Sequence, residues 1–153
     1  GLATYSNGVN KLILKIMNDN ILVVPSKLHV SSNYVFINDV VNAHVLAMKH
    51  GVTGEKYIIG GENIDYRGLF KKISTISRRE IFIIRINYNF MKACLGIIYG
   101  LSFIVKRSIG LTPKILDSLF TNRSASSQKA ILGLNYRITP LQTGLEKTIK
   151  NLL

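Results

Sequence analysis

Cysteine, tryptophan and proline are scarce in this sequence, which has one, none and three of them in 153 residues. A single cysteine, Cys94, excludes an internal disulfide, and three scattered histidines form no cluster typical of a metal site. We therefore expect no structural metal. No basic stretch followed by a long apolar run opens the chain, so a secretory signal is not indicated and a cytoplasmic location is expected. The first residue, Gly1, is compatible with a processed product, an expression scar or an excised fragment.

Acidic residues are also few, with 8 Asp and Glu against 20 Lys and Arg, which gives a net charge of +12. Such an excess favours anionic partners such as phosphates, nucleic acid or acidic lipid. Apart from the pairs Lys71-Lys72, Arg78-Arg79 and Lys106-Arg107, the basic residues are spread singly, and no RNA-binding aromatic signature accompanies them. We expect a solvated basic surface and no nucleic-acid partner.

The pattern of apolar residues predicts a mixed α/β chain. Helical spacing covers several segments, and β-branched runs predict short strands between them. The expected helices cover 7–18, 39–50, 66–76, 89–105, 113–120, 126–133 and 140–152, and the expected strands cover 21–24, 34–37, 56–59 and 81–86. With 47% apolar residues the chain can bury one core, so we expect a single domain over 1–153.

Three helix starts are predicted from capping side chains. Asp39 stands at the N-cap position of the second helix, and Asp65 at that of the third. The tetrapeptide 139–142 (TPLQ) combines a capping box with proline at the first helical position. His44 falls on the inward face of its helix, where a packed and hydrogen-bonded histidine is expected.

Four segments follow one another in an order that resembles a known family. They are 33–44 (NYVFINDVVNAH), 54–63 (GEKYIIGGEN), 126–133 (SSQKAILG) and 139–145 (TPLQTGL). Together they resemble the second half of the extended and atypical short-chain dehydrogenase/reductase family, which includes sugar-nucleotide epimerases, dehydratases and dihydroflavonol-reductase-like enzymes. Asp39 matches the aspartate of the family's first motif, and Lys129 belongs to its closing pattern.

This resemblance implies the fold class. The chain would be the substrate-side portion of a Rossmann-type enzyme, with few short strands and about six helices, because a complete doubly wound sheet has five or six strands. The family's cofactor-binding first half carries a Gly-rich turn that holds the pyrophosphate of the dinucleotide. The glycines at 54, 60–61 and 96–100 do not make that strand, Gly-x-x-Gly-x-x-Gly, helix arrangement.

The missing half decides the expected activity and partners. The complete protein is expected to use NAD or NADP as an oxidoreductase, dehydratase or epimerase, whereas this chain alone binds no cofactor and is inactive. Its partners would be a small-molecule substrate and the missing N-terminal Rossmann half, and a homodimer is compatible with the pattern.

The family's catalytic pair is a Tyr followed four residues later by a Lys. Tyr88 and Lys92 have this spacing. The family places its pair before the motif that contains Asp39, whereas Tyr88 follows Asp39 by 49 positions. A lone spacing without its structural context is weak evidence. We therefore assign no catalytic residue to this chain.

Candidate substrate contacts follow from the same resemblance. Tyr34 and Asn38 flank the strand that faces the interdomain cleft in the family, while Asp39 and Lys129 are expected to be structural. Phe36 stands where many members have His, and Ser32 stands where nucleotide-sugar epimerases often have Arg. A guanidinium is the natural bidentate partner of a pyrophosphate, so its absence favours a more apolar substrate. The resemblance implies that the substrate is a sugar or a small hydroxy or carbonyl compound.

Two alternatives belong to other functional classes. The apolar run 93–105, followed by Lys106-Arg107, is typical of a buried or interfacial helix, because about 20 residues are needed to span a membrane. A stand-alone binding module would be a monomer with a polar surface. A truncated half would instead expose the apolar face on which its missing part packs, and would form oligomers.

Overall fold

The computed structural model describes residues 9–26, 30–105, 112–119 and 121–152. Within these residues the chain has seven helices and four short strands. In order they are α1 (Val9–Asp19), β1 (Ile21–Pro25), β2 (Ser31–Tyr34), α2 (Ile37–His50), β3 (Glu62–Asp65), α3 (Tyr66–Ser77), β4 (Phe82–Ile86), α4 (Tyr88–Val105), α5 (Pro113–Leu119), α6 (Gln128–Leu134) and α7 (Leu141–Leu152).

The main core lies where α1, α3 and α7 pack beside a two-stranded parallel sheet. Strand β1 pairs with β4 in a register that sets Ile21 opposite Phe82. Successive side chains of a strand point to opposite faces, so one face of this sheet enters the core and the other does not. The buried cluster consists of Ile13, Ile16, Met17, Leu22, Val24, Leu69, Phe70, Ile73, Leu145 and Ile149.

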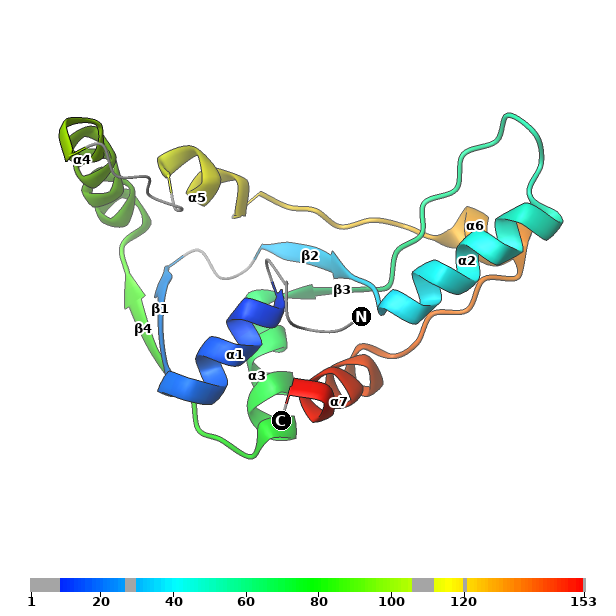
Figure 1. Ribbon diagram of the computed structural model, residues 1–153, viewed down its shortest axis with the longest axis horizontal. Helices are drawn as coiled ribbons and strands as arrows, with labels where there is room; N and C mark the ends of the chain where they lie inside the picture. Colours follow the sequence, from blue (N-terminus) through cyan, green and yellow to red (C-terminus); the bar gives the residue numbers. More distant parts are fainter. Residues whose placement is uncertain (1–8, 27–29, 106–111, 120, 153) are drawn as a thin grey trace.

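A second, antiparallel pair links this core to a smaller one. Strands β2 and β3 pair from Ser31 opposite Asp65 to Tyr34 opposite Glu62. The smaller cluster joins α2 to α6 and consists of Ala43, Ala130, Leu134 and Tyr136. Figure 1 shows the resulting elongated arrangement, with α2 and α6 at one end, α4 and α5 at the other, and the main core between them.

Of the four predicted strands, one is displaced and one is not formed. The strand expected over 34–37 is displaced to β2, because its backbone pairs with β3 up to Tyr34 and helix α2 begins at Ile37. The expected strand over 56–59 is not formed, and the strand next to Asp65 is β3. Side chains satisfy the polar backbone there: Gly60 N donates to Ser127 Oγ at 2.8 Å, and Tyr136 donates to Gly60 O at 2.9 Å. These bonds replace a strand ladder.

Of the three predicted helix caps, one is confirmed and two are wrong. Asp65 caps α3, since its Oδ1 accepts from Gly68 N at 2.8 Å. The N-cap of α2 is Phe36, which makes no side-chain cap, and Asp39 lies within the first turn. At α7 the Thr139 hydroxyl donates to Asp39, and Glu62 Oε2 accepts from Leu141 N at 3.2 Å. Partners distant in sequence therefore supply what a local capping box was expected to supply.

Two further predicted helices are present, whereas the inward position predicted for His44 is wrong. The predicted helices near 89–105 and 113–120 correspond to α4 and α5, although residue 120 lies outside the described residues, as do residues 7 and 8 of the first helix. His44 is exposed rather than inward, and its Nδ1 lies 2.7 Å from Val40 O. Among the described helices, none combines the length and apolar character needed to cross a bilayer.

Candidate functional site

A small cleft opens where β2 ends, between α1 and α7. It encloses about 120 Å³ and is largely apolar. The Thr139 and Thr148 hydroxyls in its wall are already hydrogen-bonded, to Asp39 and to Gly144 O. The cleft can therefore receive a small apolar group but offers few free polar contacts. Its lining residues are Val9, Asn10, Ile13, Tyr34, Val35, Phe36, Thr139, Leu141, Gly144, Leu145 and Thr148.

Tyr34 stands between this cleft and a polar cluster. Tyr34 and Ser32 share one face of β2, because side chains alternate along a strand. Burial of the ring is the main cause that raises the pKa of Tyr34 to about 12, and the nearby Tyr66 is the second. A hydrogen bond with Ser32 and the charge of Arg123 lower this pKa. The phenol therefore stays protonated at neutral pH. Tyr34 can donate a hydrogen bond to a ligand but cannot act as a base there.

Arg123 joins this cluster from a segment 91 positions further along the chain than Ser32. Its backbone bridges to β2: Arg123 N donates to Ser31 O at 2.9 Å, and Asn33 N donates to Arg123 O at 3.2 Å. Its charge opposes the raised pKa values of both Tyr34 and Tyr66. The sequence suggested that β2 lacks a guanidinium because position 32 is Ser. The tertiary structure brings one beside that position from the segment before α6, and no local pattern in the sequence signalled it.

A network of side-chain amides fixes this region. Asn33 Oδ1 accepts from Gly61 N at 2.8 Å, and Asn33 Nδ2 donates to Asn63 Oδ1 at 2.8 Å. Asn63 in turn donates to Ala125 O at 2.9 Å and accepts from Ala125 N at 3.1 Å. The network ties β2, β3 and the segment that carries Arg123 together. No local pattern in the sequence pointed to these residues, because the two asparagines are 30 positions apart.

Asn38 and Asp39 are adjacent in sequence but differ in environment. Asn38 is exposed in the first turn of α2 and is not part of the cleft wall, so its role in substrate binding stays a prediction. Asp39 is 6% exposed, and its carboxylate accepts from Thr139 N at 2.8 Å and from the Thr139 hydroxyl at 2.6 Å. This carboxylate holds the start of α7 against α2, next to the cleft.

Lys129 lies on α6 and is not among the residues that line the cleft. Its ammonium pairs with Glu55 and stands 5.3 Å from the centre of the Tyr57 ring. The side chain is 54% exposed. Lys129 thus attaches the segment around Glu55 to α6, and a surface pair of this kind contributes little to stability.

The side chains of Tyr88 and Lys92 both contact the carboxylate of Asp117. The Tyr88 hydroxyl donates to Asp117 Oδ1, and Lys92 Nζ lies 2.7 Å from Asp117 Oδ2. The hydrogen bond to Asp117 raises the pKa of Tyr88, and the same carboxylate raises the pKa of Lys92. A catalytic phenolate needs a lowered pKa, so this geometry opposes a role for Tyr88 as a base.

The described glycines do not form the Gly-rich turn before a helix that holds a dinucleotide pyrophosphate in the Rossmann fold. The double glycine at 60–61 precedes a strand, β3, rather than a helix N-terminus. Gly96 and Gly100 lie inside α4. Among the described residues no cluster of His, Cys, Asp or Glu side chains is arranged to hold a metal ion.

Comparison with known proteins finds solved structures of similar fold, each of which this chain covers only in part. No protein-family model matches the sequence, and a search of curated proteins found no match. Among solved structures, gox2253 superimposes with a TM-score of 0.70 and 26% identity, over 93% of this chain and 42% of that chain. UDP-glucose 4-epimerase from Thermotoga maritima gives 0.67 and 18%, over 98% and 40%. UDP-glucuronic acid 4-epimerase from Bacillus cereus, in complex with NAD, gives 0.61 and 19%, over 94% and 38%.

These matches show that the chain has part of the fold of NAD-dependent sugar epimerases of the extended short-chain dehydrogenase/reductase type. The chain spans about two fifths of the length of each of these structures. The predicted partial α/β fold with few short strands is confirmed.

Proposed function

We propose that this chain is the substrate-side half of an NAD(P)-dependent epimerase, dehydratase or reductase that acts on a sugar or a small hydroxy or carbonyl compound. The observation that carries the proposal is the one-sided coverage. Nearly all of this chain superimposes on the epimerases, but only 38–40% of each epimerase is covered. The cofactor supplies hydride transfer in such enzymes, and under this proposal its site lies in a cofactor-binding half outside this chain.

The residues at the end of β2 would bind and orient the substrate. The protonated Tyr34 hydroxyl is a hydrogen-bond donor, and the apolar cleft beside it would receive an apolar portion of the substrate. Arg123 provides a positive charge within the same cluster. A substrate with one negative or strongly polar end and a less polar body fits this combination.

An exposed apolar stripe on α2 supports docking of a second half. Ile37, Val41, Val45 and Met48 are 48%, 57%, 46% and 87% exposed. They recur at four, four and three residues, so they lie along one face of the helix. A monomeric surface rarely carries such a stripe, which is typical of an interface. We assign this stripe to the contact with the cofactor-binding half.

Membrane-surface association is the second candidate, and α4 is the observation that favours it. This helix carries a single charged residue, Lys92, and exposes Phe90, Ile97, Ile98 and Leu101 by 48–66%. An interfacial helix buries such side chains at the level of the lipid headgroups. Sedimentation with liposomes at low and high salt tests this candidate, and no binding at either salt would exclude it.

The main proposal is tested by cofactor binding. The coding sequence upstream of this chain should contain a strand, a Gly-rich turn and a helix, followed by a Tyr-x-x-x-Lys pair. NADH and NADPH are titrated by fluorescence into this chain and into the chain joined to that upstream segment. We expect binding only to the longer protein. Binding to this chain alone, or an upstream region without the Gly-rich turn, would overturn the proposal.

A further inference from the structure

A groove with three positive side chains lies between α3 and β4, on a different part of the molecule from the Tyr34 cleft. It encloses about 260 Å³ and shares no lining residue with that cleft. We call it the cationic groove. It is lined by Arg67, Phe70, Lys71, Ser74, Ile81, Ile83 and Arg85.

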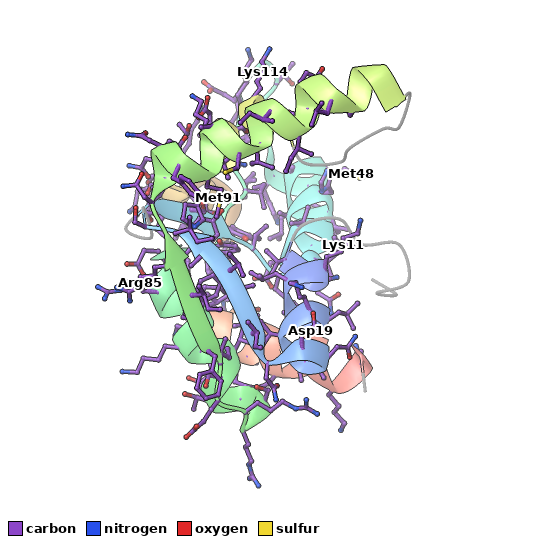
Figure 2. All side chains as sticks on the ribbon, turned by 90° about the vertical axis from the view of Figure 1, so that its left-hand side faces the viewer. Lys11, Asp19, Met48, Arg85, Met91 and Lys114 are labelled. Carbon is purple, nitrogen blue, oxygen red and sulfur yellow. The ribbon has the colours of Figure 1, made fainter. Side chains whose placement is uncertain are left out.

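The helical repeat of α3 and the alternation of side chains along β4 bring the charged residues to one opening. Arg67, Lys71 and Ser74 recur at four and three residues, so they occupy one face of α3. Ile81, Ile83 and Arg85 alternate and therefore share one face of the β4 segment. Arg85 extends outward from β4 at the edge of the molecule in Figure 2. The floor between the charges is apolar, since Phe70 is 4% exposed and both isoleucines are partly buried.

No described acidic residue pairs with the three positive charges. None of the lining residues is acidic, and within the described part of the chain none of the three cations forms an ion pair. Lys72 offers a contrast, because it pairs with Glu62 at 3.6 Å and does not line the groove. Like charges held around one opening repel each other unless an anion joins them.

We propose that the cationic groove binds the phosphate group of a small, partly apolar ligand. A guanidinium group, such as that of Arg67 or Arg85, can donate two parallel hydrogen bonds to two oxygens of one phosphate. Lys71 adds a further positive charge. The Ser74 hydroxyl donates to Arg79 O at 2.6 Å, so the cations carry the recognition. A volume below the roughly 300–1,000 Å³ of pockets for drug-sized ligands limits the ligand to a phosphate with a short apolar portion.

The same phosphate chemistry is present in a soluble phosphomonoester and in an anionic lipid headgroup. The proposal is independent of the oxidoreductase assignment, because it rests on side chains of α3 and of the β4 segment that this chain itself supplies. Inorganic phosphate, a short alkyl phosphate and vesicles that contain phosphatidic acid therefore serve as probes.

The first experiment is an amide NMR titration of this chain with inorganic phosphate and with butyl phosphate, at constant ionic strength set by chloride. We expect saturable shifts concentrated in 67–74 and 81–86, and tighter binding of butyl phosphate because of the apolar floor. Lys71→Gln and Arg85→Gln should each weaken binding by about fivefold. Lys11→Gln on α1 makes the same change of charge away from the groove and should leave binding unchanged (Figure 2).

The experiment distinguishes three cases: a soluble phosphate ligand, a lipid headgroup, and no specific site in the groove. Saturable binding of soluble phosphates supports a soluble ligand. Sedimentation with phosphatidic acid vesicles alone, lost in Arg85→Gln but not in Lys11→Gln, supports a lipid headgroup. Shifts spread over the whole basic surface, or equal weakening by all three substitutions, would overturn the groove as a site. The unperturbed part of each variant's spectrum reports that the variant is folded.

Discussion

The carboxylate of Asp39 and residue Thr139 are joined by two hydrogen bonds across 100 positions of sequence, at 2.8 Å to the backbone amide and 2.6 Å to the hydroxyl. Asp39 lies in the first turn of α2, and Thr139 lies just before α7. This contact brings the family-like motif around Asp39 next to the closing motif around Thr139. It also forms part of the surroundings of the Tyr34 cleft, which Thr139 lines.

Asp39→Ala should lower the free energy of unfolding by about 1–2 kcal/mol, because it leaves a partly buried amide and a partly buried hydroxyl without their acceptor. Thr139→Val removes only the hydroxyl bond and should cost about 1 kcal/mol. Urea denaturation of both variants and of the double variant measures the coupling between the two sites. Fully additive losses would contradict the contact.

Gly61 and Gly96 form a matched pair for substitution by alanine. A Cβ at Gly61 would lie 2.0 Å from Tyr34 O, whereas a Cβ at Gly96 meets nothing within 4 Å. Gly61→Ala should therefore destabilise the chain by more than about 2 kcal/mol, as overpacking against backbone does. Gly96→Ala should stabilise it by about 0.5–1 kcal/mol, because alanine favours a helix. Thermal unfolding of both variants decides, and equal effects would show that β2 and Gly61 are not in contact.

The raised pKa of Tyr34 predicts a loss of stability at high pH. Burial keeps the folded-state pKa at about 12, above the ordinary value of 10.0. The contribution to stability is present below pH 10 and is lost as the pH rises from 10 to 12. Two pKa units correspond to about 2.7 kcal/mol, and because the ring is only half-buried, solvent screening reduces this to about 1 kcal/mol.

Absorbance at 295 nm during a pH titration reports tyrosinate formation and checks this assignment. Tyr34→Phe should remove the latest step of the titration and flatten the fall in stability between pH 10 and 12. Tyr99→Phe, on α4, provides the control. If the latest step disappears in Tyr99→Phe instead, the environment described for Tyr34 is wrong.

The α2 stripe predicts a specific defect in assembly. Val41→Ser combined with Val45→Ser should weaken association with the cofactor-binding half by at least about tenfold, because two apolar side chains leave the interface. The same pair should reduce self-association of the isolated chain. Ile97→Ser on α4, at the opposite end in Figure 1, should not weaken association with the other half. Size-exclusion chromatography and a binding titration test both expectations, and an equal defect in Ile97→Ser would refute the assignment of the stripe.

Tyr88→Phe tests whether the Tyr-x-x-x-Lys spacing in this chain has a chemical role. We expect the kcat of the complete protein to change by less than about twofold, because Asp117 raises the pKa of Tyr88 instead of lowering it. Steady-state kinetics of the complete protein measures this. A loss of a hundredfold or more would place Tyr88 among the catalytic residues.

Features that depend on residues close in sequence could be predicted before the fold was known. Helical periodicity located the helices, the β-branched runs located β1 and β4, and Asp65 predicted its own cap because the Gly68 amide is three residues away. The order of the four motifs also indicated a partial fold of the extended dehydrogenase type, and the structural comparisons agree with it.

Features whose partners are distant in sequence became visible only in the folded chain. Asp39 was predicted to cap its own helix, but it binds Thr139, because a buried carboxylate takes the donors that the fold presents to it. The segment 56–59 was predicted to be a strand, but the Gly60 backbone next to it is held by Ser127 and Tyr136. Arg123 stands beside Ser32, and the cationic groove combines residues of α3 and β4, through contacts that no local sequence pattern specifies.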